Sequence, residues 1–580
     1  MASRRLSAPA PGKLSSVSAD DAAGWVSCPG CRTLLYRKRL ARDLGVCAEC
    51  GHHTRLSPWE RIAQLVDVGT FVERTADALP PTADRHRDPL GFHDQQPYRE
   101  RLAAAGRESG EPEAVVFGTA EVGGFPLVVA VLDFRFLGGS MGTAVGECVT
   151  AAAERARRTR TPLLLVTSSG GARMQEGCLS LMQMAKTAQA MARLREDGVL
   201  SVCLLADPTF GGVSASFATL GHVVLAEAGA LVGFAGPRVI SETVGQELPA
   251  GFQTAGFLAD HGMVDAVVPR AEVRPLVRRL LRIHAPGART RSGPGGGGAP
   301  PIRRAAALTT ADPWETVRRA RDADRPSTAD YLATAFDEFC ELRGDRCFGD
   351  DPAVIGGPAR IGDRPVMLIG HQKGHTTSER VDRNFGMAHP EGYRKARRLM
   401  EYAASLRLPV VCLVDTPGAY PGIEAEERGQ ATAIAECIAR ASTLPVPIVS
   451  VITGEGGSGG ALALATADRV LMLENGFYSV ISPEGCAAIL WRSADAAPEA
   501  ARALRITAPE LLDLGIVDAV VPEPAGGAQL APDVAAANLR RAVLDQLDEL
   551  AGIPARELLS LRYRRFRSFG ERRASEVRSA

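Results

Sequence analysis

One eight-residue segment occurs twice in this chain, about 250 residues apart. Gly262–Pro269 reads Gly-Met-Val-Asp-Ala-Val-Val-Pro, and Gly515–Pro522 reads Gly-Ile-Val-Asp-Ala-Val-Val-Pro. The two copies differ only at their second residue, and chance similarity of short apolar strings does not explain such a match at equivalent positions. Because internal repeats indicate duplicated structural units, we predict two domains of one fold in tandem.

The first of these domains contains apolar runs that alternate with helical patterns. The runs cover 125–132, 161–167, 200–206 and 223–225, and a helical pattern covers 178–195. Runs that are apolar throughout are typical of strands buried on both faces, so we predict an α/β fold. Glycine turns follow the strands at 138–142, 168–174 and 210–214. In an α/β sheet this end of the strands is where ligands bind.

The second domain repeats this plan, with apolar runs at 364–369, 408–415 and 447–452. The last run leads into the glycine segment Gly454–Ala461, and a helix-favouring run comes next. This order predicts a strand, a glycine turn and a helix. Glycine permits close approach of the backbone, and the first N–H groups of a helix lack internal partners. The segment therefore suits an anion or an oxyanion.

Three chemistries compete for Gly454–Ala461. A nucleotide-binding P-loop requires a lysine that the segment lacks. A serine-hydrolase elbow is present in form, with Ser458 at its centre, but that fold places the triad histidine after the serine, and the last histidine here is His389. What remains is an oxyanion hole of backbone amides, or a tight strand-to-helix crossing in which only glycine packs.

Four cysteines near the start have the spacing of a zinc ribbon. Cys28 and Cys31 form one Cys-x-x-Cys pair, and Cys47 and Cys50 form the second after a fifteen-residue interval. Two such pairs complete a tetrahedral site, and four thiolates leave no open position for a substrate. We therefore predict one structural zinc ion per chain, against the alternatives of a redox pair or free thiols. His52 and His53 lie outside the second pair, and we expect them at the surface.

Composition limits the classes of partner. The chain has 580 residues, and Lys+Arg and Asp+Glu are both 67, so charge gives no general reason to bind nucleic acid or an anionic membrane. No uninterrupted apolar run reaches the length of about 18 to 20 residues that a membrane helix needs. Twelve cysteines are too few for a disulfide scaffold, which favours the reducing cytosol. We expect a cytoplasmic protein.

The predicted organisation has five parts. They are a disordered tail at 1–25, the four-cysteine ribbon at 26–56, a first α/β domain at 57–284, a flexible linker at 285–304 rich in glycine and proline, and a second α/β domain at 305–580. Residues 58–114 have a polar helical pattern with proline breaks.

Several motifs resemble the two subunits of bacterial acetyl-coenzyme A carboxylase carboxyltransferase. Those similar to the β subunit are the cysteine segment 28–50, Gly139–Gly142, Ser169–Glu176, Gly212–Ala218 and Gly233–Arg238. Those similar to the α subunit are Phe336–Phe339, Gly370–Gly374, Arg383–Met387, Asp415–Gly422, the Gly454 segment and Ser482–Cys486. The resemblance extends over nearly the whole chain outside the first 25 residues and the linker, and it implies a β–α fusion.

This resemblance implies two tandem crotonase-like (ClpP/crotonase) ββα superhelix domains behind the zinc ribbon. It also implies transfer of a carboxyl group from carboxybiotin on a carrier protein to acetyl-CoA, giving malonyl-CoA for fatty acid synthesis. The family's amides would lie near Gly170 and Gly171 for the thioester oxygen, and near Gly460 and Ala461 for the biotin ureido oxygen. Ser458 is then not expected to react.

Arginine and lysine in the same motifs are candidates for contacts with the CoA phosphates, because such cations suit phosphate. They are Arg173, Arg238, Lys373 and Arg383. At His375 the family more often has arginine, which puts any charge contact there in question.

The sequence shows no biotin attachment motif and no evident ATP-grasp region. We therefore expect biotin on a separate biotin carboxyl carrier protein, a separate biotin carboxylase, and a homodimer of fused chains equivalent to α2β2. An acyl-CoA carboxyltransferase for propionyl-CoA or longer acyl-CoA remains an alternative. A nucleic-acid-binding zinc-ribbon protein fits less well, because the net charge is zero and both halves retain their glycine turns.

Overall fold

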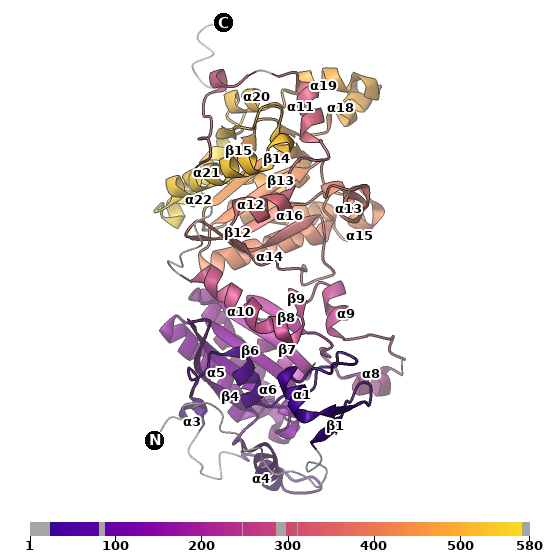
Figure 1. Cartoon of the computed structure of the whole chain (residues 1–580), viewed down its shortest axis with the longest axis vertical. Coiled ribbons are helices and arrows are strands. Elements are labelled where there is room, and N and C mark those ends of the chain that lie inside the picture. Colours follow the sequence, from indigo (N-terminus) through magenta and orange to yellow (C-terminus); the bar gives the residue numbers. More distant parts are fainter. Residues whose placement is uncertain (1–23, 80–87, 246, 286–296, 310, 571–580) are drawn as a thin grey trace. The chain divides into compact units, whose positions relative to one another are not determined.

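The computed structural model of the chain describes residues 24–79, 88–245, 247–285, 297–309 and 311–570, without the side chains of 238, 239 and 244. It divides into two compact units, which end and begin at His284 and Ala285 (Figure 1). Most of the predicted tail and residues 286–296 of the predicted linker lie outside the described residues. No described helix is long and apolar enough to cross a membrane.

The first unit begins with a small cysteine-containing module and continues into a seven-stranded sheet. The module contains β1 (Trp25–Ser27), β2 (Leu34–Tyr36) and α1 (Arg37–Arg42). The sheet strands are β3 (Val72–Glu73), β4 (Val115–Val122), β5 (Phe125–Leu132), β6 (Leu163–Ser169), β7 (Ser201–Thr209), β8 (Val223–Glu227) and β9 (Ala266–Val268), in spatial order β3 to β9. Strands β3 to β5 are antiparallel, and β5 to β9 are parallel.

Helices connect and cover this first sheet (Figure 1). They are α2 (Pro58–Leu65), α3 (Thr75–Ala78), α4 (Tyr98–Ser109), α5 (Thr143–Thr159), α6 (Gly177–Glu196), α7 (Gly211–Ser214), α8 (Pro237–Val244), α9 (Ala255–Asp260) and α10 (Arg270–His284). Helices α5 and α6 pack against each other. Val149 of α5 joins Leu165 and Leu205 of the sheet in one buried core, so the parallel strands are covered as their apolar sequences predict.

The second unit repeats the sheet in the same order. Its strands are β10 (Glu338–Phe339), β11 (Val354–Ile361), β12 (Arg364–His371), β13 (Val410–Thr416), β14 (Ile448–Gly457), β15 (Arg469–Leu473), β16 (Phe477–Ser479) and β17 (Ala519–Val521). The order is β10-β11-β12-β13-β14-β15-β17, and β16 pairs with the end of β14. Strands β10 to β12 are again antiparallel, and the sheet is parallel from β12 onward.

The helices of the second unit also match those of the first in part. They are α11 (Pro313–Ala320), α12 (Thr328–Ala335), α13 (Thr377–Asp382), α14 (Pro390–Leu406), α15 (Ile423–Glu427), α16 (Gln430–Ser442), α17 (Ser458–Ala465), α18 (Pro483–Leu490), α19 (Ala497–Leu504), α20 (Ala508–Asp513), α21 (Pro532–Leu550) and α22 (Ala555–Ser568). Helices α14 and α16 pack together as α5 and α6 do.

The repeated eight-residue segment has the same structural role in both units. In each copy the aspartate precedes the last strand, and its carboxylate accepts the N–H of the neighbouring strand at 2.7 Å: Asp265 from Val224, and Asp518 from Val470. The backbone N–H of each aspartate donates to the carbonyl of the same valine. This pair of bonds directs the chain into the last strand of the sheet, which explains why the segment recurs.

Three local expectations were wrong. The strand β14 continues through Gly457 and α17 begins at Ser458, so Gly454–Gly457 are strand residues and no separate turn exists. The described end of the predicted flexible linker is fixed, because the N–H and C=O of Ile302 both bond to Val520. The predicted helical segment 58–114 contains the strand β3 as well.

Candidate active site and metal centre

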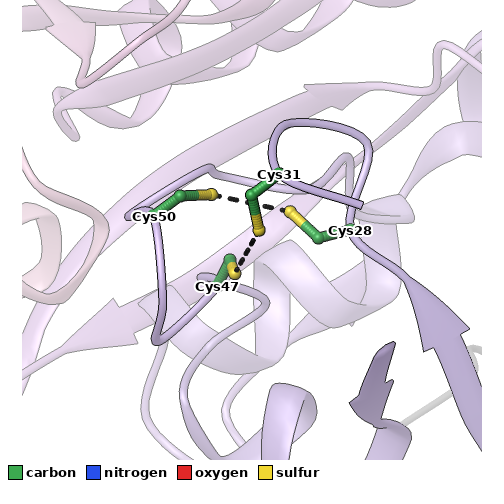
Figure 2. A group of neighbouring side chains, drawn as sticks. All are labelled: Cys28, Cys31, Cys47 and Cys50. Carbon is green, nitrogen blue, oxygen red and sulfur yellow. Dashed lines mark hydrogen bonds between the residues drawn. The ribbon is translucent and has the colours of Figure 1, made fainter. Parts of the chain in front are cut away.

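The four cysteines of the ribbon converge. Their sulfur atoms all lie within 4.8 Å of one another, with 3.7 Å between Cys28 and Cys50 and 3.8 Å between Cys31 and Cys47 (Figure 2). Four sulfurs bound to zinc at about 2.3 Å lie about 3.8 Å apart in a tetrahedron. The donor set and its spacing therefore fit a structural zinc ion, as the sequence predicts.

Each cysteine pair is a tight turn. The carbonyl of Cys28 accepts the N–H of Arg32, and the carbonyl of Cys47 accepts the N–H of Gly51. Arg32 and Gly51 have positive φ angles of 62° and 72°. These turns bring both sulfurs of a pair to the same side of the chain, which is the geometry that a metal site needs.

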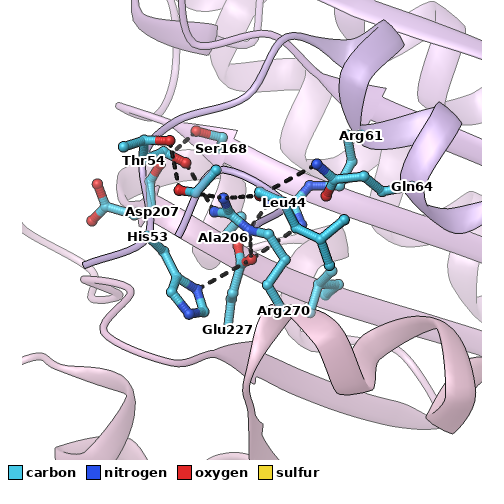
Figure 3. A network of polar contacts seen from close by, with 12 residues as sticks. Leu44, His53, Thr54, Arg61, Gln64, Ser168, Ala206, Asp207, Glu227 and Arg270 are labelled. Atoms are coloured by element: carbon cyan, nitrogen blue, oxygen red, sulfur yellow. Dashed lines mark hydrogen bonds and ion pairs between the residues drawn. The ribbon is translucent and has the colours of Figure 1, made fainter. Parts of the chain in front are cut away.

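The residues after the ribbon anchor it to the first sheet through a buried charge network (Figure 3). The carboxylate of Glu227, at the end of β8, pairs with Arg61 at 2.7 Å and with Arg270. Arg270 also donates to the carbonyls of Leu44, Gly45 and Thr54, on both sides of the second cysteine pair. Burial alone would raise the pKa of Glu227, but bonds to His53, Arg61 and Arg270 outweigh it and hold that pKa well below its usual range.

The surface expectation for the two histidines was wrong. The His53 side chain is 9% exposed, and its Nδ1 lies 3.3 Å from the carboxylate of Glu227. His52 is half-buried, and its carbonyl accepts the N–H of Cys47. Sequence spacing excluded both as metal ligands, but it carried no information about the acidic strand end that His53 contacts.

Gly170 and Gly171, which the resemblance places near a thioester oxygen, directly follow the end of β6. The N–H of Gly170 donates to the carbonyl of Gly138 at 2.8 Å, and the N–H of Gly171 donates to the hydroxyl of Ser169 at 3.0 Å. Gly171 has a φ of 118°, a conformation that favours glycine. Both predicted donors are thus hydrogen-bonded within their own segment in this structure.

Two neighbouring amides face the same space. A Cβ on Gly171 would lie 3.3 Å from the amide nitrogen of Gly212, and a Cβ on Gly212 would lie 3.4 Å from the amide nitrogen of Ala172. Among the described residues, the N–H groups of Ala172 and Gly212 have no hydrogen-bond partner. Glycine at 171 and 212 leaves the space between these two amides open. Gly212 also lies in the short helix α7, whose first N–H groups lack partners within the helix.

The second unit builds the same arrangement at the ends of β13 and β14. The Thr416 hydroxyl accepts the N–H of Gly418 at 3.1 Å, as Ser169 does for Gly171, and Gly418 has a φ of 156°. Ser458 and Gly211 each begin the following helix, with φ angles of 58° and 60°. The strand registers place these residues at equivalent positions.

The predicted residues Gly460 and Ala461 are buried in the first turn of α17. A Cβ on Gly460 would lie 2.7 Å from the amide nitrogen of Ala419, so glycine is required for this close approach. In the described part of the chain, the N–H groups of Ala419, Gly459 and Gly460 lack hydrogen-bond partners. The hydroxyl of Ser458 also bonds to no described residue, so nothing activates it as a nucleophile.

An apolar cavity of about 470 Å³ opens beside the start of α17. Ser458 and Gly459 line one part of it, and apolar side chains line most of the rest, among them Leu462, Val480 and Phe566. Small-molecule sites in proteins commonly have volumes of about 300 to 1,000 Å³ and combine apolar walls with a few polar groups. The cavity therefore has the size and character of a ligand pocket.

Two candidate phosphate contacts are corrected by their surroundings. The Arg173 side chain is 0% exposed and pairs with Glu113 at 2.6 Å. The Lys373 side chain is 15% exposed and pairs with both Asp415 and Glu455. Their charges are already neutralised inside the protein, so neither side chain extends toward a CoA phosphate in this structure.

The other candidate cations for the CoA phosphates have different surroundings. Arg383 donates to the carbonyl of Pro352 and has no carboxylate partner among the described residues, so it is available. Arg238 belongs to α8, but its side chain lies outside the described residues. His375, where the family more often has arginine, contacts the carboxylate of Asp330 at 2.8 Å. The Ala323 carbonyl and Asp330 raise the pKa of His375, so histidine preserves a charge contact here when it is protonated.

The sequence pattern missed the charge networks behind the strand ends. One signal was present: the residue directly after the repeated segment is Arg270 in the first unit and Glu523 in the second. Arg270 pairs with Glu227, and Glu523 pairs with Arg325 at 2.6 Å. The opposite charges directly after the repeated segment mark the place where each sheet binds a different N-terminal segment.

Three family models match successive parts of the chain. The family model described as "Acetyl co-enzyme A carboxylase carboxyltransferase-like" matches residues 303–570. The carboxyl transferase domain model matches 52–268, and the acetyl-CoA carboxylase zinc finger domain model matches 25–50.

Solved structures share the fold. The transcarboxylase 12S hexamer core, with methylmalonyl-coenzyme A bound, has a TM-score of 0.66 and 23% identity, covering 89% of this chain and 92% of that one. A single-chain long-chain acyl-CoA carboxylase has a TM-score of 0.62 and 22% identity, covering 85% of this chain and 46% of that one. At these identities the likeness concerns the fold, which is that of carboxyltransferase cores.

Relatives with higher identity define the family. The acetyl-coenzyme A carboxylase carboxyl transferase subunits beta/alpha of Salinispora arenicola are 59% identical over 95% of this chain and 97% of their own length. Those of Saccharopolyspora erythraea are 56% identical over 95% of each. The alpha subunit of Thermus thermophilus is 59% identical over 44% of this chain and 82% of its own length. The chain therefore belongs to the acetyl-CoA carboxylase carboxyltransferase family, in its fused beta/alpha form.

Proposed function

We propose that this protein transfers the carboxyl group of carboxybiotin, held on a carrier protein, to acetyl-CoA, giving malonyl-CoA for fatty acid synthesis. The observation that carries the proposal is the pair of amide-lined strand ends, one in each unit. They suit a reaction in which negative charge develops at two separate oxygens. The names of the fused relatives point to the same reaction.

We propose that each unit adopts the ββα superhelix of the crotonase fold. The repeated sheet order, and the helices that lie between successive parallel strands everywhere except between β15 and β16, support this topology. In such a fold the ligand lies at the carboxyl ends of the central strands, where both sets of amides are found.

The oxyanion hole of the first unit, which we call the acyl-side hole, would stabilise the enolate oxygen of the thioester. Family resemblance places this hole around Gly170 and Gly171, whose N–H groups are hydrogen-bonded within their segment here. The unpartnered amides of Ala172 and Gly212 are the donors that this segment offers, and Gly171 keeps the space between them open. Preorganised donors of this kind contribute roughly 100- to 1,000-fold each to the rate.

The biotin-side hole would stabilise the ureido oxygen through the amides of Ala419, Gly459 and Gly460, with Ala461 in the same helical turn. Carboxybiotin would release its carboxyl group as CO2. The ring nitrogen that loses it would then accept the proton from the methyl group of acetyl-CoA, and the enolate carbon so formed would bond to the CO2. The apolar cavity beside α17 suits the fused rings of biotin. Backbone donors alone perform this chemistry, so Ser458 has no covalent role.

Arg383 and Arg238 remain our candidates for the CoA phosphates. Arg383 has no carboxylate partner among the described residues, and a guanidinium group suits phosphate oxygens. The protein would work in the cytoplasm with a biotin carboxyl carrier protein and a biotin carboxylase, as a homodimer of fused chains. The reduced four-cysteine zinc site is consistent with that compartment.

An assay of the full-length zinc-loaded protein tests the function. Carboxylated carrier protein is mixed with acetyl-, propionyl-, butyryl- or palmitoyl-CoA, and the carboxylated product is measured. We expect acetyl-CoA to have the highest kcat/KM. A preference for propionyl- or palmitoyl-CoA would replace the substrate assignment, and transfer to none of the four would refute the function.

A further inference from the structure

In each unit, the pairing register between the two parallel strands that carry the amides shifts just before their carboxyl ends. In the second unit Val414 pairs with Ile452, but Thr416 pairs with Gly456, so three residues of β14 lie opposite Asp415 alone. Such an irregularity bends a strand and redirects the chain beyond the bend. Here it sets the position of the N-terminus of α17 relative to the segment Thr416–Ala419.

A buried group of charges holds this irregularity in place. The ammonium of Lys373, which comes shortly after β12, lies 2.7 Å from the carboxylate of Asp415 and 2.5 Å from that of Glu455. The same carboxylate of Asp415 accepts the backbone N–H of Glu455 at 2.9 Å. One lysine therefore ties together the ends of three adjacent strands.

Further contacts surround this group, which also lines a cavity of about 250 Å³. Glu455 accepts a second bond from Arg321 at 2.6 Å, and Arg321 also pairs with Glu484 at its more exposed end. The side chains of Asp415 and Glu455 are 10% and 6% exposed. Burial alone would lower the pKa of Lys373, but the two carboxylates raise it overall, so the ammonium remains charged.

We propose that Lys373 is a positioning residue for the biotin-side hole: by holding Asp415 and Glu455 it fixes the distance between the amide of Ala419 and those of Gly459 and Gly460. This inference rests on the proposed function. It replaces the candidate phosphate contact of Lys373 and assigns the lysine an effect on biotin without contact with it.

The test uses full-length protein and the reverse reaction, in which malonyl-CoA and biocytin give acetyl-CoA and carboxybiocytin. Displacing preorganised groups by about 1 Å can cost about 100-fold in rate. We expect Lys373→Met to lower kcat by about 10-fold or more and to raise the KM for biocytin, with the KM for malonyl-CoA unchanged within about two-fold. Lys373→Arg, which keeps the charge, should recover most of the lost kcat.

Lys395→Met is the matched control. Lys395 is likewise a buried lysine of the second unit, paired with Asp350 at 2.6 Å, but it lies on α14. We expect this control to lower thermal stability without a selective change in the KM for biocytin. Equal effects of Lys373→Met and Lys395→Met on that KM would reduce Lys373 to a general stabilising residue.

Hydrogen exchange of the zinc-loaded protein gives a readout that does not depend on turnover. We expect Lys373→Met to increase exchange at 417–420 and 456–461, and Lys395→Met to leave both segments protected. Unchanged exchange at these segments would overturn the inference. Absence of reverse reaction in the unmutated protein would instead refute the proposed function, so the two failures are distinct.

Discussion

The two units share a framework but differ in what holds it. In both, three residues of one strand lie opposite a single residue of its neighbour, at Ser168 in the first unit and Asp415 in the second. The hydroxyl of Ser168 donates to the carbonyl of Asp207 at 2.8 Å, whereas Asp415 takes part in a buried ion group with Lys373. The backbone path is therefore preserved although the side chains that stabilise it are not.

The contacts that attach the N-terminal segment of each unit to its sheet also differ. Arg270 holds the carbonyls around the second cysteine pair, and Glu523 at the equivalent position holds Arg325, which precedes α12. Arg55, near the end of the ribbon, also lies 3.3 Å from Asp207, two residues before the end of β7. The cysteine-containing module thus contacts the strand ends of the first unit, while those of the second unit are held by contacts within that unit.

The largest effect is expected at the glycine that separates the biotin-side amides. Gly460→Val would place a branched side chain 2.7 Å from the amide nitrogen of Ala419. We expect carboxyl transfer to fall by about 1,000-fold or more, because oxyanion donors are displaced. The KM for acetyl-CoA should change little, and initial rates of malonyl-CoA formation give both constants.

A matched control for that substitution is Gly256→Val in α9 of the first unit. The nearest atom to a Cβ there is the Thr254 hydroxyl oxygen at 3.8 Å, so the added side chain has room. If Gly460→Val instead abolished acetyl-CoA binding and retained turnover of biotin, the two holes would be assigned to the wrong substrates.

The opposite charges at Arg270 and Glu523 predict different consequences for zinc. Both partners of each pair are at most 3% exposed, and removing one partner of a buried ion pair costs about 3 to 5 kcal/mol. We expect Arg270→Met to lower the local unfolding free energy of its unit by about 3 kcal/mol and to weaken zinc retention. Hydrogen exchange and metal analysis after dialysis measure the two effects.

Arg325→Met provides the comparison within the second unit. It should cost a similar amount of local stability because Glu523 loses its partner, but zinc content should remain at one ion per chain. Equal loss of zinc from both variants would show that the two attachments are not separate.

Zinc removal should affect the units unequally. A chelator removes the ion that holds the ribbon together, and the contacts of Arg270 and Arg55 with the first sheet depend on that ribbon. We expect increased hydrogen exchange at 53–55 and at the end of β7, a loss of carboxyl transfer of about 10-fold, and unchanged exchange in the second unit. Recovery on adding zinc is the control, and full activity of zinc-free protein would contradict the role assigned to the ribbon.

Sequence patterns predicted the repeated strands well because continuous apolar runs such as 125–132 and 408–415 have few alternatives to burial in a sheet. The cysteine spacing fixed the zinc ligands for a similar reason. The identity of the free amides could not be predicted, because it depends on whether Ser169 or Thr416 satisfies the glycine two residues later. Pairings between residues far apart in sequence, such as Arg61 with Glu227, leave no periodic signal at all.

The smallest effect concerns the first residue of the two equivalent helices, which is Ser458 in α17 and Gly211 in α7. Ser458 has a φ of 58° where the first unit has Gly211 at 60°, and such a conformation costs a non-glycine residue of order 1 kcal/mol. We expect Ser458→Gly to stabilise the second unit by about 1 kcal/mol. Gly211→Ser should destabilise the first unit by at least as much, because a Cβ there would also lie 3.0 Å from the Cα of Gly171. Thermal unfolding, monitored by hydrogen exchange in each unit, measures both changes.

Replacing the Ser458 hydroxyl should have little effect on the reaction. Because only backbone donors act, we expect Ser458→Ala to retain carboxyl transfer within about two-fold. A collapse of activity in a folded Ser458→Ala protein would show that the hydroxyl itself takes part in the reaction.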